Sequence, residues 1–169
     1  MDGVCVRTNF INIKMLVMDV DGTLTDGKIY IGPQGEVMKA FNVKDGYAIK
    51  RILPEMGIIP VIITGRTSAI VEYRAKELDI TELYQGVTDK LVQLKKVAEK
   101  YHLTKDQIAY IGDDVNDLEC IKYCGFSACP NDAVAEVKNS SLFVCYTNGG
   151  NGVICNAIDY LLHCNYSKP

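Results

Sequence analysis

Short apolar runs alternate with helix-like segments along most of this chain, and that alternation limits the folds it can adopt. The strand-like runs lie at residues 13–18, 58–63, 83–84, 108–111, 126–129 and 142–145. The helix-like segments lie at residues 46–56, 67–78, 89–101, 116–123, 133–138 and 152–163. Strands that alternate with helices predict a parallel sheet with right-handed crossovers. We therefore expect a single doubly wound α/β domain over residues 1–169.

One segment, residues 27–41, departs from this alternation. The runs Lys28–Ile31 and Glu36–Phe41 flank Gly32–Gly35, which is typical of a β-hairpin. The large apolar side chains of this hairpin are Ile29, Ile31, Val37 and Phe41. A lone two-stranded ribbon does not keep so many apolar groups in water, so we expect further copies of the chain to cover them.

Composition excludes several classes of protein. Hydrophobic residues make up 48% of the 169 residues, which is too many for a disordered chain. The net charge is −3 with no long basic run, so non-specific nucleic-acid binding is not expected. No stretch of 18 apolar residues could span a membrane, and Met1–Phe10 lacks a secretory signal, so we expect a cytoplasmic protein. The seven cysteines have no regular spacing and are expected to be free thiols.

Polar residues gather where the predicted strands end. They are Asp19 and Asp21, then Thr64, Gly65 and Arg66, then Lys90, and finally Asp113, Asp114 and Asp117. The carboxyl ends of parallel strands share one edge of a sheet, and ligands bind there in open α/β folds. We therefore expect these side chains to converge on one site.

The residue types at this edge suit phosphoryl transfer. Asp19 and Asp21 repel each other unless a cation such as Mg²⁺ lies between them. A carboxylate beside Mg²⁺ can attack phosphorus, and we assign that role to Asp19. Asp21 would protonate the leaving oxygen and then deprotonate the attacking water.

The other polar residues would support that chemistry. Thr64 would hold phosphoryl oxygens, and Lys90 would balance the added negative charge. Asp113 would complete the Mg²⁺ site, and Asp114 could serve as an alternative ligand. Asp117 would hold the ligands in position without contacting the ion itself.

Each of these residues also has an ordinary structural interpretation. Asp113 and Asp114 could cap the next helix, Thr64 could cap the helix near Thr67, and Lys90 could be a solvated helix residue. Four such clusters at four strand ends, in this order, favour the catalytic interpretation.

The same motifs resemble those of the haloacid dehalogenase superfamily of phosphatases, from about Lys14 to Leu162. The resemblance implies that Asp19 is the nucleophile and Asp21 the acid and base. It also implies that Mg²⁺ binds Asp19, Asp113 and the backbone carbonyl of Asp21. Many members carry a cap domain between the motifs, but the spacings here leave room only for the hairpin, so this chain resembles the capless branch.

Longer stretches resemble one family in that branch, the 3-deoxy-D-manno-octulosonate 8-phosphate phosphatases. These stretches are residues 24–27, 41–47, 63–66, 83–86 and 149–152. The family implies a phosphorylated keto-sugar acid as substrate, bound by Asp21, Gly65 and Arg66. It also implies a homotetramer, in which Arg74 reaches a neighbouring subunit and helps to bind substrate.

The size of the sugar acid is less well defined by the sequence. Arg66 favours the eight-carbon substrate, because nine-carbon relatives carry a glutamate at that position, and a guanidinium suits a carboxylate or phosphate. Asn151 stands where the octulosonate phosphatases usually have an arginine, which leaves a nonulosonate 9-phosphate substrate as an alternative.

Two other classes of protein are open alternatives. A phospho-receiver domain uses similar residues, but its acidic pair precedes the phosphorylated Asp, whereas here the acidic pair of Asp113 and Asp114 follows Lys90. A non-catalytic assembly module would lack a motif residue, and none is missing.

Overall fold

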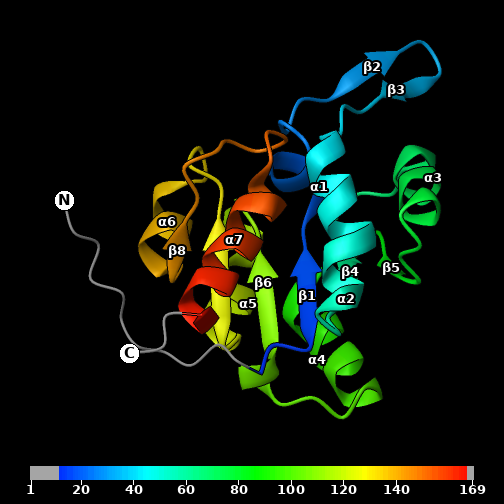
Figure 1. Cartoon of the computed structure of the whole chain (residues 1–169). Coiled ribbons are helices and arrows are strands. Elements are labelled where there is room, and N and C mark those ends of the chain that lie inside the picture. Colours follow the sequence, from blue (N-terminus) through cyan, green and yellow to red (C-terminus); the bar gives the residue numbers. More distant parts are fainter. Residues whose placement is uncertain (1–11, 167–169) are drawn as a thin grey trace.

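The structure, a computed structural model, describes residues 12–166 and contains a six-stranded sheet (Figure 1). Its strands run in the order β5-β4-β1-β6-β7-β8, and every neighbouring pair is parallel. Their bounds are β1 Met15–Met18, β4 Ile59–Ile63, β5 Glu82–Tyr84, β6 Ile108–Ile111, β7 Phe126–Cys129 and β8 Phe143–Val144. From the central β1 the chain first runs outward through β4 to β5. It then returns to the other side of β1 and runs outward through β6 and β7 to β8, which confirms the predicted doubly wound fold.

Helices connect the strands, as the alternation predicts. They are α1 Val43–Tyr47, α2 Leu53–Glu55, α3 Ala69–Glu77, α4 Lys90–Lys100, α5 Leu118–Tyr123, α6 Ala135–Ser140 and α7 Val153–Tyr166. α1 and α2 are joined by the helical segment Ala48–Ile52, so the helix predicted to begin at residue 46 begins at Val43. The Asn42 side chain accepts a hydrogen bond from the Lys44 backbone N–H, which fixes the earlier start.

The sheet is packed on both faces. In β1, Leu16 and Met18 belong to one core cluster, with residues of α1–α2, α3 and α7. Met15 and Val17 belong to the other, with residues of α4, α5 and α6. Successive strand residues point to opposite faces, so an uninterrupted apolar run is what a strand covered by helices on both sides requires.

The hairpin forms a separate two-stranded sheet, with β2 at Tyr30–Gly32 and β3 at Gly35–Met38. It projects from the edge of the main sheet where the strands end (Figure 1). Its second strand is shorter than predicted, because Phe41 leaves the ribbon and packs against the main core.

Two simpler expectations can be compared with the described residues. Within residues 12–166, no helix is long and apolar enough to cross a membrane. Five cysteines with described side chains are free thiols, as predicted, while Cys5 and Cys164 lie outside the described side chains. The chain ends of the predicted domain, residues 1–11 and 167–169, also lie outside the described residues.

Candidate active site

Asp19 stands at the carboxyl end of β1, between the neighbouring strands β4 and β6. The Asp19 residue is only 5% exposed, and its backbone N–H donates a 3.0 Å hydrogen bond to the carbonyl of Ile111 in β6. The ammonium of Lys90, the first residue of α4, lies 2.8 Å from Asp19 Oδ1. Lys90 is 3% exposed, so the alternative of a solvated helix lysine is wrong.

Asp113 follows β6 and approaches the turn Val20–Leu24 from across the site. The Thr23 hydroxyl donates a 2.9 Å hydrogen bond to Asp113 Oδ1. Gly22 has a φ of +96°, and a Cβ at this residue would lie 2.0 Å from Asp113 Oδ2. Glycine is therefore required here both for the backbone conformation and for the close approach of the Asp113 carboxylate.

Asp117 is completely buried and holds the site together. Its Oδ1 accepts hydrogen bonds from Lys90 Nζ at 2.7 Å and from the Tyr110 hydroxyl at 2.6 Å. Its Oδ2 accepts the backbone N–H groups of Asp113 at 3.0 Å and Asp114 at 3.2 Å. Both oxygens are thus engaged by the protein, which is the geometry of a supporting residue.

Asp114 has a different position from its neighbours. Its side chain is exposed and accepts a 2.7 Å hydrogen bond from the Val115 backbone N–H, so it caps the helical turn Val115–Asp117. The acidic cluster found among the described residues consists of Asp19, Asp113 and Asp117, and Asp114 is not part of it. The capping interpretation therefore describes Asp114 better than that of an alternative ligand.

The acidic cluster fits a hard divalent cation. One carboxylate oxygen from each of its three residues lies within 4.8 Å of the others. Burial, and then the charge of Asp117, raise the pKa of Asp19 to about 6, although Lys90 opposes the shift. Burial, and then the charge of Asp19, raise the pKa of Asp113 to about 7. A cation between Asp19 and Asp113 would relieve this repulsion, and carboxylate oxygens are the ligands that Mg²⁺ prefers.

Asp21 lies beside this cluster and faces the hairpin. Its carboxylate pairs with Lys39, and its Oδ2 lies 3.7 Å from Arg66 Nε. Glu36 on β3 closes the arrangement, because its Oε1 lies 3.0 Å from Lys39 Nζ and 3.6 Å from Arg66 Nη2. Asp21, Lys39, Glu36 and Arg66 thus alternate in sign around what we call the charge ring. The Ser68 hydroxyl also donates a hydrogen bond to Glu36.

Thr64 and Gly65 follow β4 at the same edge of the sheet. Thr64 is 2% exposed; its backbone N–H donates to the Tyr84 carbonyl, and its own carbonyl accepts from the Val87 N–H. Ser68 caps the next helix, with its hydroxyl accepting from the Val71 N–H, so the alternative that Thr64 is the cap is wrong.

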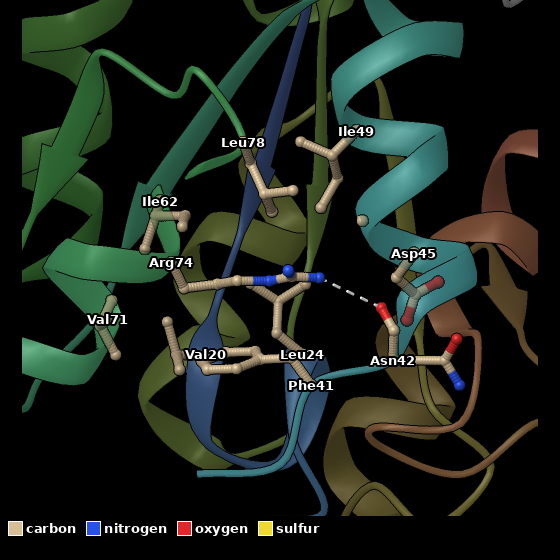
Figure 2. Close-up of a pocket in the computed structure, with 11 residues that line it drawn as sticks. Val20, Leu24, Phe41, Asn42, Asp45, Ile49, Ile62, Val71, Arg74 and Leu78 are labelled. Carbon is tan, nitrogen blue, oxygen red and sulfur yellow. Dashed lines mark hydrogen bonds between the residues drawn. The ribbon is translucent and has the colours of Figure 1, made fainter. Parts of the chain in front are cut away.

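Arg74 lies in a socket of its own chain between α1 and α3 (Figure 2). Its Nη2 donates a 3.4 Å hydrogen bond to the Asn42 carbonyl, and its guanidinium lies 5.5 Å from the centre of the Phe41 ring. A Cβ on Gly46 would lie 2.3 Å from the same Nη2. The predicted role of Arg74 in substrate binding thus has no counterpart in the contacts within this chain and stays a prediction.

Sequence reasoning missed several residues of the site. Thr23 stands in the same short motif as Asp19, and that position could have identified it. Tyr110 carries the one hydroxyl of an otherwise apolar run, Ile108–Ile111, which is a weak signal. Lys39 and Glu36 lie within the hairpin and carry no local signal of a site.

Comparisons with known proteins identify the family of this chain. The family model of the haloacid dehalogenase-like hydrolases matches residues 70–156. A 3-deoxy-D-manno-octulosonate 8-phosphate phosphatase from Yersinia pestis is 42% identical over 151 residues, which cover 89% of this chain and 80% of the relative. The corresponding enzyme from Salmonella typhi is 40% identical over 157 residues, 93% of this chain and 83% of the relative.

Solved structures give the same result. The crystal structure of the Yersinia pestis phosphatase has a TM-score of 0.89 at 40% identity and covers 95% of this chain and 86% of its own. A phosphatase of this name from Moraxella catarrhalis, in complex with magnesium, phosphate and KDO, has a TM-score of 0.88 at 37% identity, over 94% of this chain and 90% of its own. This chain therefore belongs to the haloacid dehalogenase-like hydrolases, in the family of the octulosonate phosphatases.

Proposed function

We propose that this protein is a Mg²⁺-dependent phosphatase that hydrolyses 3-deoxy-D-manno-octulosonate 8-phosphate to the free sugar acid and inorganic phosphate. The observation that carries the proposal is the buried Asp19 carboxylate, which lies 2.8 Å from the Lys90 ammonium and within the same acidic cluster as Asp113. The identity of about 40% to enzymes of that name supports the choice of substrate.

Asp19 begins the reaction by attacking phosphorus. The bond between phosphorus and the sugar oxygen breaks, and Asp21 gives its proton to that oxygen. Asp21 then takes a proton from a water molecule, which attacks the phosphorus of the aspartyl-phosphate and releases phosphate and Asp19. Lys90 balances the negative charge throughout, and Thr64 holds phosphoryl oxygens from the end of β4.

Asp19, Asp113 and the backbone carbonyl of Asp21 would hold Mg²⁺. When bound there, the cation supplies charge neutralisation and polarises the phosphoryl group. The structure of the Moraxella catarrhalis relative contains magnesium, and a relative from Haemophilus influenzae has been solved in a cobalt-bound form. The cobalt-bound structure has a TM-score of 0.89 at 35% identity and covers 94% of this chain and 92% of its own.

Arg66 and Gly65 would contact the sugar acid. The Arg66 side chain is 49% exposed and stands beside Asp21, so it can reach a carboxylate or phosphate of the substrate. The Asn151 side chain donates a hydrogen bond to the Gly149 carbonyl of its own loop and contributes no positive charge. Arg66 therefore favours the eight-carbon substrate, and Asn151 is the reason to include a nine-carbon substrate in the test.

The experiment is a phosphate-release assay with Mg²⁺ and three substrates: octulosonate 8-phosphate, a nonulosonate 9-phosphate and glucose 6-phosphate. We expect the highest kcat/KM for the octulosonate, and no release by Asp19→Asn, which keeps the size of the side chain. A higher kcat/KM for the nonulosonate 9-phosphate would make that compound the assigned substrate in place of the octulosonate. No release from any sugar phosphate would overturn the proposal.

We also propose that the protein works as a homotetramer assembled through the hairpin. Its exposed apolar residues include Ile31 at 74%, Val37 at 58% and Met38 at 50%. We expect sedimentation to detect a tetramer that Ile31→Ser weakens, whereas Val92→Ser, at an exposed valine on α4, leaves it intact. A monomer at working concentration would contradict this assembly.

The cytoplasmic location stays a prediction.

A further inference from the structure

The charge ring joins three segments that are distant in sequence. Asp21 lies in the turn after β1, Glu36 and Lys39 belong to the hairpin, and Arg66 lies in the loop after β4. Each cation contacts both carboxylates, so the four charges balance. The hairpin therefore places charged groups directly beside the residue that we assign as acid and base.

Lys39 is the most enclosed member of the ring. Its side chain is 1% exposed, compared with 17% for Asp21 and 14% for Glu36. Burying an ammonium group is unfavourable unless carboxylates compensate its charge. Lys39 is thus held by Asp21 and Glu36, and in return it fixes the direction of the Asp21 carboxylate.

Arg66 is held much more loosely. Its side chain is 49% exposed, and its contacts with Asp21 and Glu36 measure 3.7 and 3.6 Å. At those lengths the guanidinium makes ion pairs without close hydrogen bonds. Arg66 can therefore turn toward an anionic substrate while Lys39 keeps Asp21 in place.

We propose that Lys39 is a positioning residue, which holds the Asp21 carboxylate in the direction that proton transfer to the leaving oxygen requires. Glu36 secures Lys39, and the Ser68 hydroxyl secures Glu36. This inference rests on the proposed function, because it assigns Lys39 a role through Asp21. The hairpin thereby contributes to catalysis within its own chain, separately from any contact between subunits.

The test is a double-mutant cycle with octulosonate 8-phosphate as substrate. Lys39→Met should lower kcat by about 10- to 100-fold, as loss of a supporting partner commonly does, with little change in KM. In an Asp21→Asn background the same substitution should cause no further loss, because Lys39 acts through the Asp21 carboxylate. If the two losses multiply, the positioning role is refuted.

Three further variants control for charge and folding. Lys28→Met removes another hairpin lysine, whose side chain is 71% exposed, and should leave kcat unchanged. Lys39→Arg keeps the charge and should recover part of kcat. Should Lys39→Met fail to fold, Glu36→Gln loosens Lys39 without removing it, and should lower kcat in the wild-type background but not in Asp21→Asn. Unchanged kcat in Glu36→Gln would then overturn the proposal.

The outcomes separate this inference from the proposed function. If the wild-type protein releases no phosphate from any substrate, the proposed function fails and the positioning role falls with it. If Asp19→Asn abolishes release while folded Lys39→Met keeps the wild-type kcat, the phosphatase assignment stands and only the role of Lys39 is lost.

Discussion

The two halves of the site are built differently. Asp19, Lys90 and Asp117, which we call the buried triad, are each at most 5% exposed and joined by contacts of 2.7 and 2.8 Å. The charge ring next to it is more open except at the enclosed Lys39, and its Arg66 contacts reach 3.7 Å. The triad is suited to fix the nucleophile, whereas Arg66 in the ring can move when a substrate enters.

Their origins differ in the same way. The buried triad comes from segments at the carboxyl ends of the parallel strands, so the sheet itself brings the residues together. Half of the charge ring comes from the hairpin, which belongs to a separate sheet. We therefore expect loss of Asp117, which holds the triad together, to lower stability, whereas substitutions in the ring should disturb mainly the reaction.

Asp117→Ala should have the largest effect on stability. It leaves the buried Lys90 with one carboxylate and deprives the Tyr110 hydroxyl and two backbone N–H groups of their acceptor. Breaking such a buried network costs about 3–5 kcal/mol of unfolding free energy. Urea denaturation measures the loss. Glu36→Ala in the ring should cost clearly less, because Lys39 remains paired with Asp21, and equal losses would refute the contrast between the two regions.

Magnesium binding should depend on pH through the acidic cluster. The pKa of Asp113 is raised to about 7 and that of Asp19 to about 6, so protons compete with the cation below pH 7. Apparent Mg²⁺ affinity should fall about tenfold per pH unit between pH 7 and 6, where one proton must leave Asp113, and more steeply below pH 6, where Asp19 must lose a proton as well. Titration calorimetry between pH 5 and 8 measures this dependence, and a flat profile would contradict it.

The raised pKa values of Asp19 and Asp113 also determine how the stability of the metal-free protein changes with pH. Without metal, the folded protein keeps protons that the unfolded chain releases near the ordinary value of 3.8. This contribution to stability is fully present below about pH 4 and is lost as the pH rises through 6 to 7. Added Mg²⁺ should restore stability at pH 8.

Gly46→Ala should have the smallest effect on stability. Alanine favours a helix over glycine by about 1 kcal/mol, but its Cβ would displace the end of the Arg74 side chain from the socket. Because that end is flexible, we expect a net change within about 1 kcal/mol, together with loss of the contact to the Asn42 carbonyl. Urea denaturation and a crystal structure of the variant check both points. A large destabilisation would mean that the socket is rigid.

The sequence contains enough information for the fold and for the centre of the site. The apolar run through β1 predicts a strand that helices cover on both faces, and this is confirmed. Asp19, Lys90 and Asp113 could be assembled in advance, because residues that follow parallel strands must meet at one edge.

The hairpin side could not be anticipated in this way. Whether Lys39 reaches Asp21 depends on how the ribbon leaves the sheet, and no periodicity in the hairpin specifies that direction. The socket of Arg74 likewise depends on the distance between α1 and α3, which Gly46 permits. Both features arise from tertiary packing between segments that do not pair in one sheet.

The account depends most on Asp19 becoming covalently bound to phosphorus. The direct measurement is to quench the enzyme in acid during turnover of octulosonate 8-phosphate, reduce it with borohydride and sequence its peptides by mass spectrometry. Reduction of an aspartyl-phosphate yields homoserine, and we predict homoserine at residue 19. Homoserine at another aspartate would contradict the account. The absence of homoserine would also contradict it, if phosphate is released steadily under conditions in which the intermediate accumulates.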